Sequence, residues 1–243
     1  MSLSRIRQDI KMEFQAVASS SKGNSYCVRQ KASLLLLEAG VEVSRIQMAT
    51  GFSVSAAMGC LISHRHLDHA KSAKNIMNMG VDVYVSQETA AALELTGHRL
   101  HIIKPLEQFN VGDWKVLPFE TEHDCEGSLG FLIADQKGEK LLFATDSYYL
   151  KYKFTGLHII AIECNYEAGI LAENVAGSKV DRELKNRVMK SHFSLENVLE
   201  FLRANDLSKV REIYLLHLSD SNSDAAKFRQ KVAEQTGKEV YVA

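Results

Sequence analysis

A run of metal-ligand residues is the feature that most limits what this chain can fold into. The run reads His64-Arg65-His66-Leu67-Asp68-His69, and it lies between an apolar stretch at 58–62 and an expected helix at 69–79. Residues i and i+2 of a strand project to the same side, so His64 and His66 can leave the strand end together. Asp68 and His69 then lie in the turn that opens the helix, where they can reach a second ion. Because imidazole and carboxylate groups bind borderline divalent metals, the run predicts a metal site.

Further ligands are expected where other apolar runs end. Each of His123, Asp146 and His217 lies at or just past the end of an apolar run that predicts a strand. Functional side chains on sheet scaffolds tend to gather at the ends of strands. These three residues are therefore the candidates that would complete the site.

The run is a complete H-x-H-x-D-H signature, and through it the sequence resembles the metallo-β-lactamase fold hydrolases. The resemblance implies an α/β (α+β) fold, a four-layer αββα sandwich formed by one domain over residues 1–243. It also implies two divalent metal ions. Their expected ligands are His64, His66 and His123 at the first ion, Asp68, His69 and His217 at the second, and Asp146 between them.

This ligand set implies hydrolysis by a metal-activated water. Two ions about 3.5–4 Å apart would share a bridging hydroxide, since metal coordination lowers the pKa of water from about 15.7 to about 7. Asp68 is expected to hold the second ion and to orient the hydroxide, which gives it a catalytic role. Histidine-rich ligation favours zinc, while the carboxylates admit manganese or iron.

Four further segments resemble one branch of the superfamily, the YycJ-like (WalJ-like) hydrolases. They are 18–25 with S-S-x-G-N, 162–167 with E-x-N, 186–194, and 216–222 with H-L-S-x-x-N. Members of this branch are nuclease-like, and several are linked to 5′-exonuclease activity on DNA. One departure is Glu38, because the branch usually carries Asp-x-Gly at that point. The position supports the site from behind the ligands, so metal binding is expected to persist.

The same resemblance assigns residues to the substrate. His192 is expected to orient the substrate or to act as a general acid for the leaving oxygen. The other expected substrate contacts are Ser19, Asn24, Asn165, Lys179, Arg182 and Lys185, the last three for a nucleic-acid backbone. The basic residues are mixed with Asp181 and Glu183, so the electrostatic footprint for nucleic acid is weak.

Composition agrees with an ordinary globular chain. The 243 residues are 46% hydrophobic and 24% charged, and the formal net charge of −1 gives no sign of a polyanion-binding protein as a whole. The start of the chain lacks the apolar core of a signal peptide, and no stretch approaches the ~20 apolar residues of a membrane span. The cysteines form no C-x-x-C pair and are expected to be reduced, in a cytoplasmic protein. They are Cys27, Cys60, Cys125 and Cys164.

The pattern of apolar residues predicts strands and helices in alternation. Strands are expected at 12–18, 25–30, 33–38, 58–63, 81–85, 100–104, 114–119, 129–135, 140–145, 157–163, 211–217 and 239–242. Helices are expected at 42–50, 69–79, 87–96, 181–190, 194–204 and 223–236. A hairpin turn is expected at 136–139. Ser194 is expected to cap the N-terminus of the helix at 194–204.

Three functions remain open from the sequence. The first is a phosphodiesterase or exonuclease acting on nucleic acid, with DNA as the expected partner. The second is hydrolysis of a small ester, thioester, lactone or cyclic phosphodiester, because the same metals polarise a carbonyl or a phosphoryl group. The third is a non-catalytic binding protein that kept the fold. A basic groove at the metals would favour the first, a closed apolar pocket the second, and a missing ligand the third.

Overall fold

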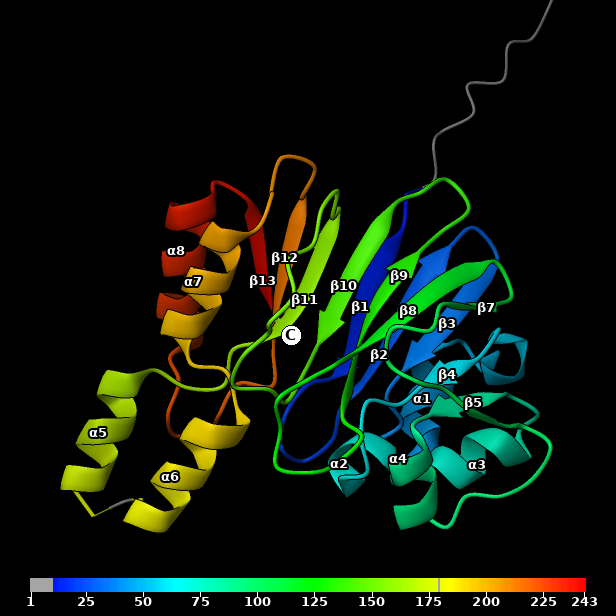
Figure 1. The fold of residues 1–243 in the computed structure, drawn as a ribbon, viewed down its shortest axis with the longest axis horizontal. Coiled ribbons are helices and arrows are strands. Elements are labelled where there is room, and N and C mark those ends of the chain that lie inside the picture. Colours follow the sequence, from blue (N-terminus) through cyan, green and yellow to red (C-terminus); the bar gives the residue numbers. More distant parts are fainter. Residues whose placement is uncertain (1–10, 179) are drawn as a thin grey trace, which may run out of the picture.

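Two β-sheets pack face to face in the computed structural model, which describes residues 11–178 and 180–243 and, of Arg182, the backbone alone (Figure 1). The first sheet has the order β1 (Glu13–Ala18), β2 (Ser25–Gln30), β3 (Ser33–Leu37), β4 (Cys60–Leu61), β5 (Val83–Val85) and β6 (Leu100–Ile102). The second has the order β13 (Glu239–Val242), β12 (Glu212–Leu216), β11 (Ile159–Glu163), β10 (Lys140–Ala144), β9 (Leu129–Ala134), β8 (Trp114–Glu120) and β7 (Phe109–Val111).

Both sheets are mixed. In the first sheet β3 to β6 run parallel, and in the second β10 to β13 run parallel. The carboxyl ends of parallel strands lie at one edge of a sheet, so the residues that follow β3, β4, β10, β11 and β12 are brought together there. This edge is the lower one in Figure 1.

Helices cover the outer faces of both sheets (Figure 1). The first sheet carries α1 (Val43–Ala49), a 3₁₀ turn η1 (Val54–Ala56), α2 (Leu67–Ala70), α3 (Ala73–Asn78) and α4 (Gln87–Ala92). The second carries α7 (Leu195–Ala204) and α8 (Ala225–Thr236). The pair α5 (Ala168–Ala176) and α6 (Arg182–Ser191) projects beyond the edge of the second sheet.

The alternation of side chains along each strand explains these layers. In β10, Leu141 and Phe143 belong to the core between the two sheets, whereas Leu142 and Ala144 belong to the core beneath α7 and α8. The residues of β3 alternate in the same way between the core between the sheets and the core beneath α1, α3 and α4. The chain therefore has the four-layer αββα architecture that was predicted.

Most predicted elements are confirmed, and three differences have physical reasons. The expected helix 69–79 is two helices, α2 and α3, separated at Ser72. The Ser72 hydroxyl does not cap α3 but donates a hydrogen bond to the Val41 carbonyl. The strand β7 was not predicted because it has only three residues before the tight turn at Gly112. The helix α5 was not predicted because it begins Ala-Gly and buries only Leu171. The expected hairpin at 136–139 and the Ser194 cap are both present.

None of the helices within 11–178 and 180–243 is long and apolar enough to cross a membrane. The four cysteines are all free and buried.

Candidate metal centre

Three histidines from two strand ends form the first ligand group. His64 and His66 follow β4, and His123 follows β8. The His66 Nδ1 atom lies 3.0 Å from His64 Nε2 and 3.2 Å from His123 Nε2. A neutral imidazole has only one N–H, so three ring nitrogens that face one point cannot all be satisfied by hydrogen bonds to one another. Such an arrangement is suited to binding a cation. Burial lowers the pKa of His64 well below its usual value, which keeps it neutral and able to coordinate.

A second ligand group lies beside the first. The Oδ2 atom of Asp68 is 3.3 Å from His69 Nε2 and 3.6 Å from His217 Nε2. The His217 Nε2 atom is buried and has no hydrogen-bond partner among the described residues. Since buried polar atoms are normally satisfied, this nitrogen indicates a missing partner of the kind a metal ion would supply. The donor set therefore fits a second cation.

Asp146 lies between the two groups, with one carboxylate oxygen toward each. Its Oδ2 is 3.8 Å from His64 Nε2 and 3.7 Å from His123 Nε2. Its Oδ1 is 3.4 Å from His69 Nε2 and 3.1 Å from His217 Nδ1. All seven residues predicted as ligands are thus brought to one place, and a carboxylate in this position can bridge two ions.

The backbone is strained at this edge of the sheets. Glu38, Asp146 and His217 have φ values of 61°, 45° and 54°, in the left-handed region that residues with a side chain rarely adopt. Each lies one or two residues past the end of a strand, and each reaches the ligand cluster. Such strain persists only where the surrounding structure holds it, and it gathers at functional sites.

Protons and carboxylates balance the charge of the cluster in the metal-free chain. Burial opposes protonation of His69 and His217, but the Asp146 carboxylate outweighs burial and raises the pKa of both imidazoles well above its usual value. Burial likewise opposes ionisation of Asp146, but His217 and His69 hold its pKa well below the usual range. A metal ion would replace these protons as the positive charge of the site.

Three residues expected to contact substrate are hydrogen-bonded to the candidate ligands. Ser19 accepts a hydrogen bond at 2.8 Å from the His217 N–H, and Asn165 donates one at 2.8 Å to the His217 carbonyl. These two bonds hold the strained backbone of His217 from both sides. The buried Asn24 amide lies 3.1 Å from His69 Nε2 and donates to the Asp68 carbonyl at 3.3 Å.

Glu38 also lies behind the ligands, as expected for its position in the sequence. Its buried carboxylate accepts hydrogen bonds of 3.3 Å from the Ser63 N–H, and one oxygen is 3.7 Å from His69 Nδ1. A glutamate at position 38 therefore still lies beside His69, the candidate metal ligand that it would orient. Of the expected backbone contacts, Lys179 and the side chain of Arg182 lie outside the described residues, and Lys185 lies half-buried on α6.

Glu163, the first residue of the E-x-N motif, is a site residue to which the sequence analysis gave no role. It is fully buried at the end of β11, and its Oε1 lies 2.6 Å from His192 Nδ1 and 3.0 Å from His217 Nδ1. Its Oε2 accepts hydrogen bonds from the Ser147 and Phe193 N–H groups. The available signal was a charged residue that ends an otherwise apolar strand, because a buried carboxylate is retained only where it is paired.

Two neighbours of His123 also reach the first group. The ligand atoms of Cys125, His64, His66 and His123 lie within 4.8 Å of one another. The Oδ1 atom of Asp124 is 3.2 Å from His123 Nε2. Cys125, which was expected only to be a reduced thiol, therefore lies beside the candidate site.

His192 lies beside the candidate ligand cluster. Its ring is mostly buried and lies 4.0 Å from Asp146 Oδ2 through Nδ1. Burial opposes its protonation, but the Glu163 carboxylate outweighs burial and raises the pKa of His192 above the usual value. A protonated imidazole beside the ligand cluster is what a general acid requires.

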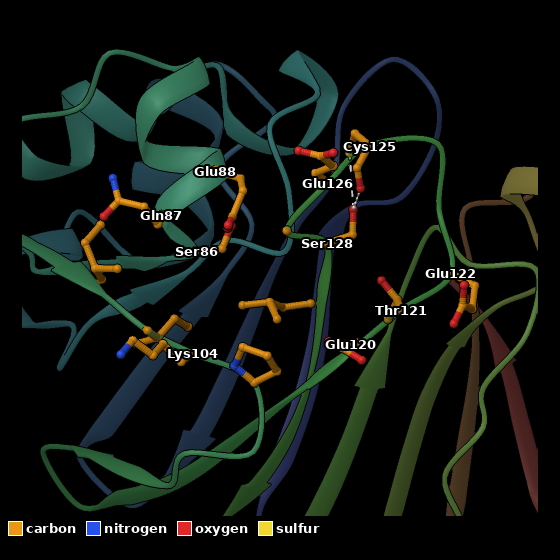
Figure 2. A pocket seen from close by; sticks show the side chains of 15 residues that line it. Ser86, Gln87, Glu88, Lys104, Glu120, Thr121, Glu122, Cys125, Glu126 and Ser128 are labelled. Carbon is orange, nitrogen blue, oxygen red and sulfur yellow. Dashed lines mark hydrogen bonds between the residues drawn. The ribbon is translucent and has the colours of Figure 1, made fainter.

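A groove of about 600 Å³ opens next to the cluster, and Figure 2 shows the side chains that line it. It runs between the segment that carries His123 and the start of α4. Its charged side chains are Glu88, Glu120, Glu122, Glu126 and Lys104. The volume is that of a small-molecule site, while the excess of carboxylates disfavours a polyanion.

The fold and the ligand cluster together define a class, the metal-dependent hydrolases with an αββα sandwich. The chain belongs to the β-lactamase superfamily, because the family model described as "Beta-lactamase superfamily domain" matches residues 36–218. It is 26% identical over 233 residues to Exodeoxyribonuclease WalJ of Streptococcus pneumoniae serotype 2, strain D39, with 88% of this chain and 84% of that protein covered.

Solved structures agree on the fold. The metallo-β-lactamase fold protein YhfI from Bacillus subtilis superposes with a TM-score of 0.73 at 15% identity, and 96% of each chain is covered. A diphosphatase from the PhnP family superposes with a TM-score of 0.65 at 12% identity, covering 96% of this chain and 95% of that one. At these identities the likeness concerns the fold alone.

Proposed function

We propose that the protein is a dimetal-dependent phosphodiesterase that shortens DNA from its 5′ end and is folded as one domain. The observation that carries the proposal is the meeting of two ligand groups at Asp146, with His192 beside them. Similarity to the pneumococcal exodeoxyribonuclease supports DNA as the substrate. The free cysteines fit a cytoplasmic protein.

Seven residues would hold the two ions. His64, His66 and His123 would bind the first, Asp68, His69 and His217 would bind the second, and Asp146 would contact both. When bound, the ions supply a water acidic enough to attack at neutral pH and a positive charge that polarises the phosphoryl oxygen. Histidine-rich ligation favours zinc over manganese or iron.

The protein's own groups would direct the reaction. Asp68 accepts a hydrogen bond from the attacking water and so sets its direction. Glu163 occupies Nδ1 of His192, which leaves Nε2 as the nitrogen that can give a proton to the leaving oxygen. No serine or cysteine nucleophile is needed.

Replacing His192 with alanine should lower kcat by about 10²–10⁴-fold while KM changes little, because the histidine serves the chemical step rather than binding. Single-turnover kinetics on a 5′-labelled oligonucleotide would separate the two effects. The exposed His98, which contacts no ligand, provides the matched control His98→Ala. A rise in KM with unchanged kcat would show that His192 binds the substrate instead.

A second candidate, hydrolysis of a small ester or thioester, is supported by the volume of the groove of Figure 2, but that groove is lined by carboxylates and is not the closed apolar pocket such a function would favour. The metal-loaded protein should be tested on single-stranded DNA, duplex DNA, RNA, bis-p-nitrophenyl phosphate and a thioester. If the substrate is DNA, rising salt should lower its cleavage more steeply than that of the small phosphodiester, because basic groups then hold the backbone. Equal salt slopes, with a thioester hydrolysed orders of magnitude faster, would establish the second candidate.

A further inference from the structure

An aromatic and basic segment directly follows the bridging aspartate. Residues 148–153 read Tyr-Tyr-Leu-Lys-Tyr-Lys. Tyr148 and Tyr149 are 38% and 54% exposed, which is unusual for side chains so close to a buried ligand cluster. Proteins that bind single strands combine aromatic rings, on which bases stack, with basic residues along the backbone path.

The backbone of this segment is fixed to the walls of the site. The Tyr148 N–H donates to the Glu122 carbonyl at 3.0 Å, and the Tyr148 carbonyl accepts from the Asn197 amide at 3.0 Å. The Tyr149 carbonyl accepts from the Ser147 hydroxyl at 2.7 Å. The two rings are therefore presented on an ordered backbone, which lowers the entropic cost of binding.

The segment lies next to the proposed general acid. Tyr149 and Phe193 line the same hollow of about 110 Å³, and Phe193 is the neighbour of His192 in the chain. The hollow is below the size of a small-molecule site, so it can receive only part of a ligand. Ser147, the residue before the segment, and His192 both contact the Glu163 carboxylate, so the segment begins beside this histidine.

Charge excludes the larger groove as the path of a nucleic acid. Besides Glu120, which is paired with Lys151, three glutamates line that groove against Lys104, so it disfavours phosphates. Along the tyrosine segment Lys151 is already paired with Glu120 at 2.6 Å, while Lys153 is exposed and can face a phosphate. The tyrosine segment therefore offers the better surface for a strand that enters the site.

We infer that Tyr148 and Tyr149 form a stacking platform for unpaired bases and make single-stranded DNA ends the preferred substrate. The inference rests on the proposed nuclease function. Duplex DNA keeps its bases stacked inside the helix, so the platform acts on a single strand alone. Lys153 holds the strand by its phosphate, and the rings hold it by its bases.

The test measures binding of the metal-loaded protein to labelled phosphorothioate oligonucleotides by fluorescence anisotropy. In the double variant Tyr148→Ala/Tyr149→Ala, the affinity for a single strand should fall. The expected loss is about 5- to 150-fold per base that no longer stacks. Affinity for a duplex of the same sequence should change little. Tyr149→Trp should keep single-strand affinity, because a larger ring still stacks.

The control variant is Phe52→Ala. Phe52 is 76% exposed and lies just after Ala49 in the chain. The Ala49 carbonyl accepts a hydrogen bond from Arg29, near the end of β2. This end of β2 is remote from Asn24, which precedes the start of the strand. This variant should bind both oligonucleotides like the unmodified protein. Equal losses for single strand and duplex, or no loss in the double variant, would overturn the platform. If the unmodified protein cleaves neither bis-p-nitrophenyl phosphate nor DNA, the proposed function fails as well.

Discussion

Replacing Asp68 with alanine is expected to lower turnover by roughly 10³-fold or more, because two contributions to the transition state are lost together. The Oδ2 atom of Asp68 faces both His69 and His217, so its removal opens the second ligand group. The same carboxylate would orient the attacking water. Asp68 is a quarter exposed and contributes nothing to the apolar cores, so the fold should persist. Initial rates and a thermal melt would measure the two effects.

Asp113→Ala is the matched control for this variant. Asp113 is exposed in the turn between β7 and β8, where it accepts hydrogen bonds from Ser33 and Gln136. Its replacement should leave turnover unchanged. Near wild-type turnover of Asp68→Ala at matched metal occupancy would show that the assigned role of Asp68 is wrong.

Purified without chelator, the protein should bind up to two transition-metal ions per chain, and His217→Ala should bind one. His217 supplies the unpartnered Nε2 atom of the second group, and Asp68 and His69 alone make a weak site. The first group does not include His217, so its ion should remain. Elemental analysis after gel filtration measures the metal content of each variant.

Metal uptake by the unmodified protein should release protons and tighten as the pH rises. The pKa values of His69 and His217 are raised well above the usual value in the metal-free chain, so both are protonated near neutral pH. A metal ion must displace these protons, and each displaced proton favours binding at higher pH. Titration in a weakly buffered solution detects the release. His98→Ala should behave like the unmodified protein, and a metal-saturated sample that holds no ion would contradict the assignment.

The first part of the site is predictable from the sequence because its ligands are neighbours in the chain. The spacing of His64, His66, Asp68 and His69 is fixed by one strand end and one helix start. His123, Asp146 and His217 were predictable because each lies just past an apolar run, and strands that run in the same direction end at one edge of the sheet.

Other parts of the site depend on contacts that no local pattern encodes. Glu163 acquires its role from the meeting of β11 with residues 192 and 217, which are distant in sequence. Ser19 and Asn165 belong to sequence motifs, but only the packed structure shows that they are hydrogen-bonded to the His217 backbone. The short α5 escapes prediction because its apolar face covers a small cluster rather than a sheet.

One oxygen atom of Glu163 contacts two imidazoles with different proposed roles. Its Oε1 lies within hydrogen-bond distance of His217, a candidate metal ligand, and of His192, the candidate acid. When His217 coordinates through Nε2, its Nδ1 must keep a proton and donate it to this oxygen. The orientation of a candidate metal ligand and that of the candidate acid are therefore fixed by the same carboxylate. A change that moved Glu163 would disturb metal binding and proton transfer together.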